Sequence, residues 1–293
     1  MPASLCPVAS PPVVTHILRF ACPDRPGIVA GVASDLVAIG ANILDNAQYG
    51  DETSGIFCMR TRFSCAIDSS DEIASHLQAR VSDLGGEMSV VRSDHRPRLL
   101  LMVSKHDHCL HDLLYRWRAN ELRVDIAGVV SNHPDLAEFV AGFGLDYLHV
   151  PVTATTKPEA EAQLLAVVED RRVDLVVLAR YMQILSDELC LALRGRAINI
   201  HHSFLPGFKG ARPYHQAFER GVKLIGATAH YVTVDLDEGP IIVQDTARVN
   251  HSHTAEDMTV IGKDVERLVL SRAVQAHVEG RVFLLGDRTA VFP

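Results

Sequence analysis

The stretch Val173-Asp174-Leu175-Val176-Val177-Leu178-Ala179 decides the fold class of this chain, because it is apolar at every position but one. Similar short apolar runs occupy residues 99–103, 126–130 and 197–200, and helical patterns such as residues 159–170 separate them. Short apolar strands that alternate with helices are typical of a parallel sheet that is covered on both faces. We therefore predict an α/β fold with a mainly parallel, Rossmann-like sheet in this part of the chain.

Residues 14–93 show a different pattern, in which residues 14–21 alternate apolar and polar side chains as a half-buried strand does. Five further elements are expected: a helix over 28–39, strands over 43–49 and 56–63, a helix over 71–84 and a strand over 88–91. Glycines follow both helices and end them in the usual way. This order predicts an antiparallel sheet with helices on one face, the ferredoxin-like βαββαβ arrangement.

The polar segment Ser93-Asp94-His95-Arg96-Pro97-Arg98 has little to bury, so we place a domain boundary there. A chain of 293 residues is long enough for two domains, which we expect over residues 13–93 and 98–293. Residues 1–12 contain Pro and Ser but no basic start followed by an apolar core. They predict a disordered tail rather than a signal peptide.

The composition excludes several classes of partner. The formal net charge is −8 and there is no run of Lys or Arg, so nucleic acid is not an expected partner. No apolar run is long enough to cross a bilayer, and we expect no association with membranes. The six cysteines form no CxxC pair and lie in apolar or strand-like contexts, which favours a reducing, cytoplasmic setting.

One predicted strand end reads Ile198-Asn199-Ile200-His201-His202-Ser203-Phe204-Leu205-Pro206. Ligands of parallel sheets bind beyond the carboxyl ends of the strands. Because side chains alternate along a strand, Asn199 and His201 point to the same side there. Two polar groups that emerge together beside a loop favour a functional site over a structural histidine.

An acidic turn follows later, in His230-Tyr231-Val232-Thr233-Val234-Asp235-Leu236-Asp237-Glu238-Gly239-Pro240-Ile241-Ile242. An apolar strand ends in this turn, and a second strand over residues 241–249 returns from it. Asp235 and Asp237 are common residues of ordinary turns. The residues alone therefore leave open whether either carboxylate takes part in chemistry, or how close it lies to His201.

Asn199-x-His201, combined with Leu236-Asp237-x-Gly239-Pro240-Ile241, resembles the active-site pair of the formyltransferase fold. Glycinamide ribonucleotide transformylase and methionyl-tRNA formyltransferase share this fold, and the resemblance extends over roughly residues 98–283. It implies that Asn199, His201 and Asp237 are the catalytic residues. It also implies a folate pocket, with the backbone of Gln183 and Leu185 at the pterin edge. The substrate-binding residues would be Tyr181, Met182, Gln183, Leu185 and His230.

Across residues 14–291 the chain resembles one family of this fold, the formyltetrahydrofolate deformylases. This resemblance rests on two segments, His201-His202-Ser203-Phe204-Leu205-Pro206 and Pro213-Tyr214-His215-Gln216-Ala217. It implies hydrolysis of 10-formyltetrahydrofolate to formate and tetrahydrofolate, which supplies formate to purine synthesis and balances one-carbon pools. Asp237 would act as the base, and Asn199 and His201 would stabilise the oxyanion. No metal or organic cofactor is expected.

Asp24-Arg25-Pro26-Gly27-Ile28-Val29, followed by Gly40-Ala41-Asn42-Ile43, resembles an ACT domain. The resemblance implies a small effector at Asp24, Gly27 and Asn42, with methionine activating and glycine inhibiting, and a homo-oligomer, either a dimer or a tetramer. Backbone N–H groups at the start of the helix would bind the effector carboxylate. The alternative is a domain that shapes a turn and only dimerises.

Histidines and a cysteine gather in Ser104-Lys105-His106-Asp107-His108-Cys109, with His111 nearby. Their spacing matches no zinc motif, and a helix that starts near Asp107 would splay the side chains apart. The segment also lacks the glycines that a phosphate-binding turn needs, which leaves water as the acceptor. The sequence does not decide between catalytic and packing roles for His202 and His215.

Two other functions stay open beside hydrolysis. The chain could transfer the formyl group to a small amine, or it could be an amino-acid sensor that binds folate without turnover. Intact Asn199, His201 and Asp237 argue against the sensor, because a sensor needs no such residues.

Overall fold

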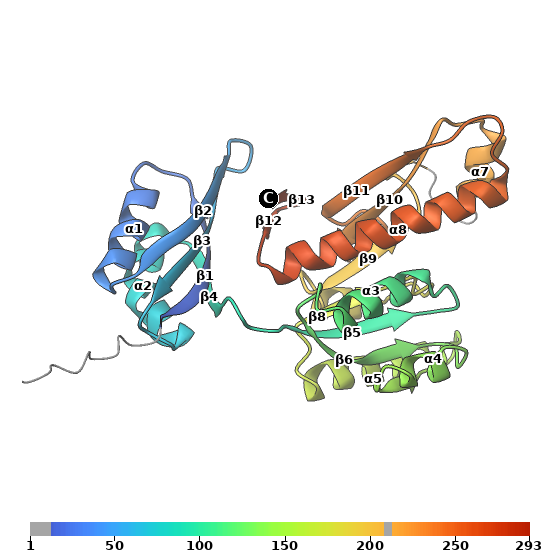
Figure 1. The fold of residues 1–293 in the computed structure, drawn as a ribbon, viewed down its shortest axis with the longest axis horizontal. Coiled ribbons are helices and arrows are strands. Elements are labelled where there is room, and N and C mark those ends of the chain that lie inside the picture. The colour runs from blue at the N-terminus through green and yellow to red at the C-terminus, as the bar shows by residue number, and fades with distance from the viewer. Residues whose placement is uncertain (1–12, 208–212) are drawn as a thin grey trace, which may run out of the picture. The chain divides into compact units, whose positions relative to one another are not determined.

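The computed structural model describes residues 13–207 and 213–293, and the chain divides into two compact units, residues 1–95 and 96–293 (Figure 1). The tail predicted at residues 1–12 lies outside the described residues.

The first unit is built from one antiparallel sheet and two helices. Its elements are β1 (Val14–Pro23), α1 (Ile28–Ala38), β2 (Asn42–Asp51), β3 (Ile56–Cys65), α2 (Ser70–Leu84) and β4 (Glu87–Arg92). The strand order is β2-β3-β1-β4, and every neighbouring pair is antiparallel. The predicted order of elements and the antiparallel sheet are confirmed.

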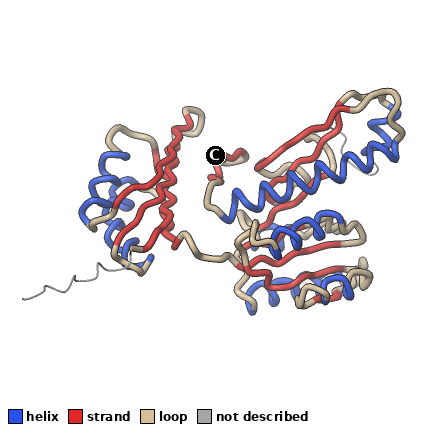
Figure 2. Tube along the Cα trace, viewed as in Figure 1, coloured by secondary structure: helices blue, strands red, loops and turns tan. Residues whose placement is uncertain are grey.

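Alternation along β1 explains how this unit forms its core. Leu18, Phe20 and Cys22 are buried, while the residues between them are half-buried. The buried side chains pack with the apolar face of α1, which includes Val32 and Leu36. Figure 2 shows both helices on one side of this sheet.

The second unit begins at Arg96 and contains the longer part of the chain. Its strands are β5 (Arg98–Val103), β6 (Asp125–Ser131), β7 (Tyr147–His149), β8 (Leu175–Leu178), β9 (Ala197–His201), β10 (Leu224–Tyr231), β11 (Ile241–Arg248), β12 (Val282–Leu285) and β13 (Arg288–Val291). Its helices are α3 (His108–Arg118), α4 (Ala137–Ala141), α5 (Lys157–Asp170), α6 (Asp187–Ala192), α7 (Pro213–Glu219) and α8 (Ala255–Val278).

Within the described residues, seven strands of this unit form one sheet in the order β11-β10-β9-β8-β5-β6-β7. Strands β7, β6, β5, β8 and β9 run parallel, and β10 and β11 are antiparallel additions at one edge. The predicted mainly parallel sheet is confirmed. Because β6 and β8 lie on opposite sides of β5, the strand order reverses there, and ligand sites of open α/β sheets lie at such points.

The apolar strands are buried on both faces, as their continuous hydrophobicity predicts. Along β5, Leu99 and Leu101 pack into one cluster with α3 and α8, whereas Leu100 and Met102 pack into another with α5 and α6. Helix α8 was not expected from the sequence pattern. Among the described residues no helix is long and apolar enough to span a membrane.

Candidate active site

The end of β9 and the loop after β10 place the predicted catalytic residues. Asn199 and His201 lie on β9, and β10 pairs with it so that His230 stands opposite Asn199. Asp237 lies in the loop before β11 and has a left-handed backbone, with φ of 57°. A non-glycine residue rarely adopts this conformation, and such strain concentrates at functional sites.

Three side chains meet at the Asp237 carboxylate. His201 Nδ1 lies 3.2 Å from Oδ2, and Asn199 Nδ2 lies 3.4 Å from Oδ1. His230 Nε2 is 3.7 Å from the same Oδ1 and 3.3 Å from Asn199 Nδ2. The structure therefore brings together the motif residues that are far apart in the sequence.

The surroundings keep Asp237 ionised. Burial acts to raise the pKa of this carboxyl, but hydrogen bonds from His201 and His230 outweigh burial and hold the pKa well below its ordinary value. The other ring nitrogen of His201, Nε2, is buried and has no hydrogen-bond partner among the described residues. A buried polar atom without a partner is a natural point for a ligand to bind.

These residues line a pocket of about 640 Å³, within the range of small-molecule sites. The predicted folate-binding residues Tyr181, Met182, Gln183, Leu185 and His230 all line it. The Met182 N–H donates to Ser104 Oγ at 2.9 Å, which fixes the loop after β8. Met182, Ile184 and Leu236 are large apolar side chains that stay exposed. They suit an apolar ring that enters from solvent.

Known proteins resemble the chain over nearly its whole length. A family model described as formyl transferase matches residues 97–274. A formyltetrahydrofolate deformylase of Corynebacterium sp. strain P-1 is 46% identical, and the match covers 95% of this chain and 98% of that protein. The crystal structure of the Burkholderia mallei formyltetrahydrofolate deformylase is 48% identical with a TM-score of 0.92, covering 96% of this chain and 100% of that one. This chain belongs to the formyltetrahydrofolate deformylase family.

A more distant relationship covers a smaller share of the chain. Glycinamide ribonucleotide transformylase 1 from Symbiobacterium toebii is 31% identical with a TM-score of 0.64, covering 69% of this chain and 97% of that one. The formyl transferase match over residues 97–274 lies within the second unit, which is therefore the formyltransferase domain of this deformylase-family member.

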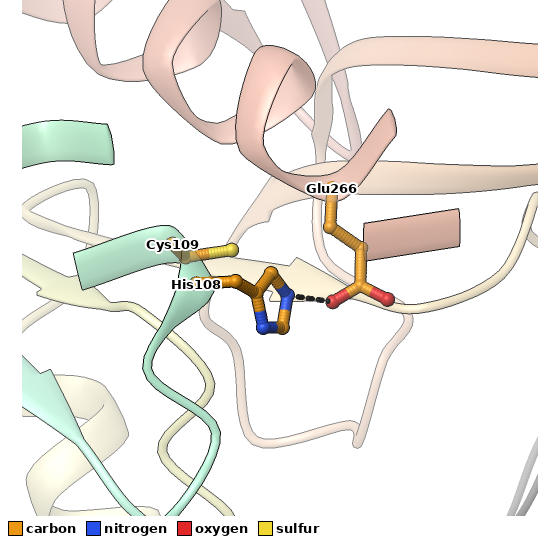
Figure 3. Close-up of side chains that lie close together, drawn as sticks. All are labelled: His108, Cys109 and Glu266. Atoms are coloured by element: carbon orange, nitrogen blue, oxygen red, sulfur yellow. Dashed lines mark hydrogen bonds and ion pairs between the residues drawn. The ribbon is translucent and has the colours of Figure 1, made fainter. Parts of the chain in front are cut away.

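A second carboxylate, the buried Glu266 on α8, lines another part of the same pocket. Its side chain is 1% exposed, yet it has three partners. Tyr214 donates its hydroxyl at 2.6 Å, His108 Nε2 lies at 2.8 Å, and Arg180 Nε lies at 3.3 Å. Figure 3 shows the Glu266 side chain extending from α8 to the His108 ring at the start of α3.

These partners keep Glu266 ionised despite its burial. Burial acts to raise the pKa of Glu266, but the hydrogen bond with His108, the charge of Arg180 and the hydrogen bond from Tyr214 lower it to about 2. A buried carboxylate persists only when paired and hydrogen-bonded in this way. Gly262 makes room for the contact, because a Cβ there would lie 2.1 Å from the Tyr214 ring.

His108, Cys109 and Glu266 are the metal-ligand types that come close together in the described chain, with ligand atoms within 4.8 Å of one another (Figure 3). They fit a metal ion poorly. The Arg180 guanidinium beside Glu266 repels a cation. Burial raises the pKa of the Cys109 thiol, whereas zinc binds the thiolate. The predicted splaying holds for His111, which turns away to stack on Phe139 with ring centroids 3.8 Å apart, but not for His108 and Cys109, whose ligand atoms stay within 4.8 Å of each other.

Sequence reasoning missed Arg180 and Glu266. Arg180 closely follows the apolar strand β8 and directly precedes the predicted folate-binding residue Tyr181. Glu266 lies among the buried positions of α8, which recur at helical spacing, with Gly262 and Leu270 one turn away on each side. A carboxylate on the apolar stripe of a helix is the signal that could have found it.

The three effector residues predicted in the first unit lie near the start of α1 or of β2. The Asp24 carboxylate lies over Gly50 of β2, at 2.8 Å from the position a Cβ would take there. Gly27 is the N-cap of α1 with φ of 94°, and no side chain caps the helix. Asn42 is exposed at the start of β2. No hydrogen bond joins Asp24 and Asn42 among the described residues.

Proposed function

We propose that this chain hydrolyses 10-formyltetrahydrofolate to formate and tetrahydrofolate, which supplies formate to purine synthesis and balances one-carbon pools. One observation carries the proposal: Asn199, His201 and His230 converge on the Asp237 carboxylate at the edge of a pocket large enough for a folate ring. Relatives at 41–48% identity over most of the chain bear the name formyltetrahydrofolate deformylase, which supports the same activity.

In the proposed first step, Asp237 takes a proton from water as the water oxygen bonds to the formyl carbon. The carbonyl electron pair moves onto the formyl oxygen, and Asn199 and His201 donate hydrogen bonds to that oxyanion. One positioned donor of this kind contributes ~10²–10³ in rate. Because the pKa of Asp237 lies well below its ordinary value, the carboxyl holds the proton weakly, and His201 at 3.2 Å can share it.

In the second step the oxyanion reforms its carbonyl bond and the bond from carbon to N10 breaks. N10 takes the proton that Asp237 and His201 hold, and tetrahydrofolate forms. The other product, formic acid, releases its proton to water as formate. Every proton in this sequence moves between water, substrate and side chains of the chain, so the scheme needs no metal or organic cofactor.

Folate binding is assigned to the loop after β8. The backbone of Gln183 and Leu185 would hydrogen-bond the pterin edge, with Tyr181 and Met182 packed around the ring. Burial raises the pKa of Tyr181 to about 12, so its hydroxyl stays neutral beside an uncharged ring. The exposed apolar side chains of Met182 and Ile184 would cover the remainder of the substrate.

The decisive experiment measures formate release from 10-formyltetrahydrofolate by the purified chain, with and without small amines. Release of formate at the same rate in both conditions supports the hydrolase. A formylated amine at the expense of formate would instead establish a transferase, and binding without turnover would establish a sensor.

The five described cysteines are free thiols, which is compatible with a reducing, cytoplasmic compartment.

We further propose that the first unit is an ACT regulatory domain in a homo-oligomer, with an amino-acid effector at Asp24, Gly27 and Asn42. Open N–H groups of the first turn of α1 support a carboxylate site, since no side chain caps that turn. An effector alters turnover only if it prefers one of two arrangements of the protein, and a tenfold effect needs roughly 1.4 kcal/mol of preference.

Titration of methionine and glycine against wild type and Gly27→Val tests this regulation. Nothing lies within 4 Å of a Cβ at Gly27, so valine acts through its unfavourable backbone angle and not through crowding. We expect methionine to raise turnover, glycine to lower it, and the variant to respond less. If neither amino acid changes wild-type turnover, the unit is better described as an assembly domain.

A further inference from the structure

The histidine that follows the catalytic strand, His202, has a defined tautomer. Arg180 Nη1 lies 2.5 Å from His202 Nδ1. A guanidinium only donates hydrogen bonds, so Nδ1 must accept and carries no proton. The proton of the neutral ring is therefore on Nε2. Arg180 itself is held in place by its left-handed backbone, with φ of 67°, and by the buried Glu266.

The surroundings of His202 keep its ring neutral. Burial is the largest influence, the charges of Arg180 and His201 act in the same direction, and together they lower the pKa of His202 from 6.5 to about 4. Glu266 and Asp237 act in the opposite direction and are outweighed. At neutral pH the Nε2–H group is then a hydrogen-bond donor without a net charge.

This donor is free and stands at the reaction site. His202 lines the pocket, and no hydrogen bond among the described residues reaches its Nε2. Its ring stacks on that of His201, with centroids 5.0 Å apart and planes inclined by 27°. On another side it faces Tyr214 at 6.4 Å. A ligand that reaches His201 therefore comes within reach of His202.

We propose that His202 is a further catalytic residue, which donates its Nε2–H to the oxygen that enters the substrate. That oxygen belongs first to the attacking water and then to the hydroxyl of the tetrahedral intermediate. Arg180 and Glu266 are positioning residues, because they hold the ring in the tautomer that can donate. The inference rests on the proposed hydrolysis and names the groups that bind its second reactant, water.

The hydrogen bond fits the balance of the reaction. Water gives one proton to Asp237 and keeps the other as its oxygen bonds to the formyl carbon. His202 contributes a hydrogen bond to that oxygen and loses no proton. Asn199 and His201 remain on the former carbonyl oxygen, so the two oxygens of the developing formate have separate donors.

Two substitutions at position 202 separate hydrogen bonding from packing. Glutamine carries an N–H group near the position of His202 Nε2, whereas leucine fills similar space without a donor. We expect His202→Leu to lower kcat about 10²-fold with little change in KM, and His202→Gln to retain activity within about tenfold of wild type. His149→Leu, at an exposed histidine outside the pocket, is the matched control.

Binding of tetrahydrofolate and the thermal midpoint are measured for each variant, so that a folding defect is recognised. Equal losses in both position-202 variants, or a leucine variant as active as wild type, would overturn the role of His202. If wild type releases no formate, the proposed function fails first, and that outcome is distinct from either result.

Nitrogen-15 spectra of labelled histidines give a readout that a packing role would not change. We expect wild-type His202 to show the neutral pattern with the proton on Nε2 at pH 7. Arg180→Met removes the donor that selects this tautomer, and we expect the pattern to become mixed and kcat to fall while tetrahydrofolate still binds. A wild-type ring protonated on Nδ1 would contradict the proposal whatever the kinetics.

Discussion

Two carboxylates border the same pocket, the buried Glu266 and the partly buried Asp237, and their surroundings differ in kind. Glu266 is 1% exposed and is held by a guanidinium, a phenol and an imidazole. Asp237 is 16% exposed and meets two imidazoles and an amide at 3.2 to 3.7 Å, whereas the partners of Glu266 lie at 2.6 to 3.3 Å. Glu266 is fully partnered, whereas Asp237 is loosely held and sits beside His201, whose Nε2 has no partner among the described residues.

The difference indicates which carboxylate can gain and lose a proton during a reaction. Proton transfer requires a group whose hydrogen bonds can rearrange. The short hydrogen bonds of Glu266 with Tyr214 and His108, together with the charge of Arg180, oppose rearrangement there. Its charge instead balances Arg180 and keeps the region around His202 in one arrangement. Asp237 is therefore expected to govern turnover, and Glu266 is expected to govern stability.

The sharpest test of this comparison is Asp237→Asn. The amide keeps the shape of the side chain but cannot accept a proton, so we expect formate release to fall by ~10²–10⁴ while folate still binds. Steady-state formate release and a tetrahydrofolate titration measure the two effects. A variant that keeps more than a tenth of wild-type turnover would contradict the role of Asp237 as base.

Removing the oxyanion donors comes next in expected size. Asn199→Ala and His201→Ala should each lower turnover by ~10²–10³. Both donors serve one oxygen, so the double variant should lose less than the product of the single losses. A strictly multiplicative loss, measured in the same formate assay, would indicate that the two side chains act in separate steps.

Glu266→Gln should affect stability more than any single change at Asp237. It leaves the Arg180 guanidinium buried without its counter-charge, and breaking such a pair typically destabilises by about 3–5 kcal/mol. Asp264→Asn on the same helix removes an exposed partner of Arg267 and should change stability by less than about 1 kcal/mol. Denaturant unfolding compares the two variants. Equal losses in the free energy of unfolding would refute the structural role of Glu266.

His202 should make a smaller contribution to the stability of the fold, and this contribution should depend on pH. Because the pKa of His202 is lowered from 6.5 to about 4 in the folded chain, the unfolded chain binds more protons between these values. Stability therefore falls as the pH is lowered from 6.5 to 4. In thermal unfolding, the advantage of wild type over His202→Leu should shrink across this window. A difference independent of pH would mean that the ring is not held neutral.

The smallest expected effect is that of a chelator. His108, Cys109 and Glu266 are potential metal ligands, but the Arg180 guanidinium beside Glu266 repels a cation and burial raises the pKa of the Cys109 thiol, so EDTA should leave formate release unchanged. Loss of activity that zinc restores would show that His108, Cys109 and Glu266 form a metal centre. Glu266 would then belong to the reaction centre and would no longer be a purely structural carboxylate.

Local patterns in the sequence were sufficient for much of the fold. Alternation in β1, the apolar runs of β5 and β8, and the glycines after helices predicted both sheets, because strand and helix periods repeat over a few residues. The same alternation predicted that Asn199 and His201 share one side of β9. The family motifs then singled out Asp237, although nothing local distinguishes it from a turn residue such as Asp235.

Only the tertiary structure decided which distant side chains meet. The pairing of β9 with β10 sets Asn199 opposite His230, and a left-handed turn returns Asp237 to both. Packing of α8 against the sheet places Glu266 beside Arg180, although the two residues are 86 positions apart in the sequence. Such contacts depend on which apolar faces pack together, and a short window of sequence records the face of an element but not its partner.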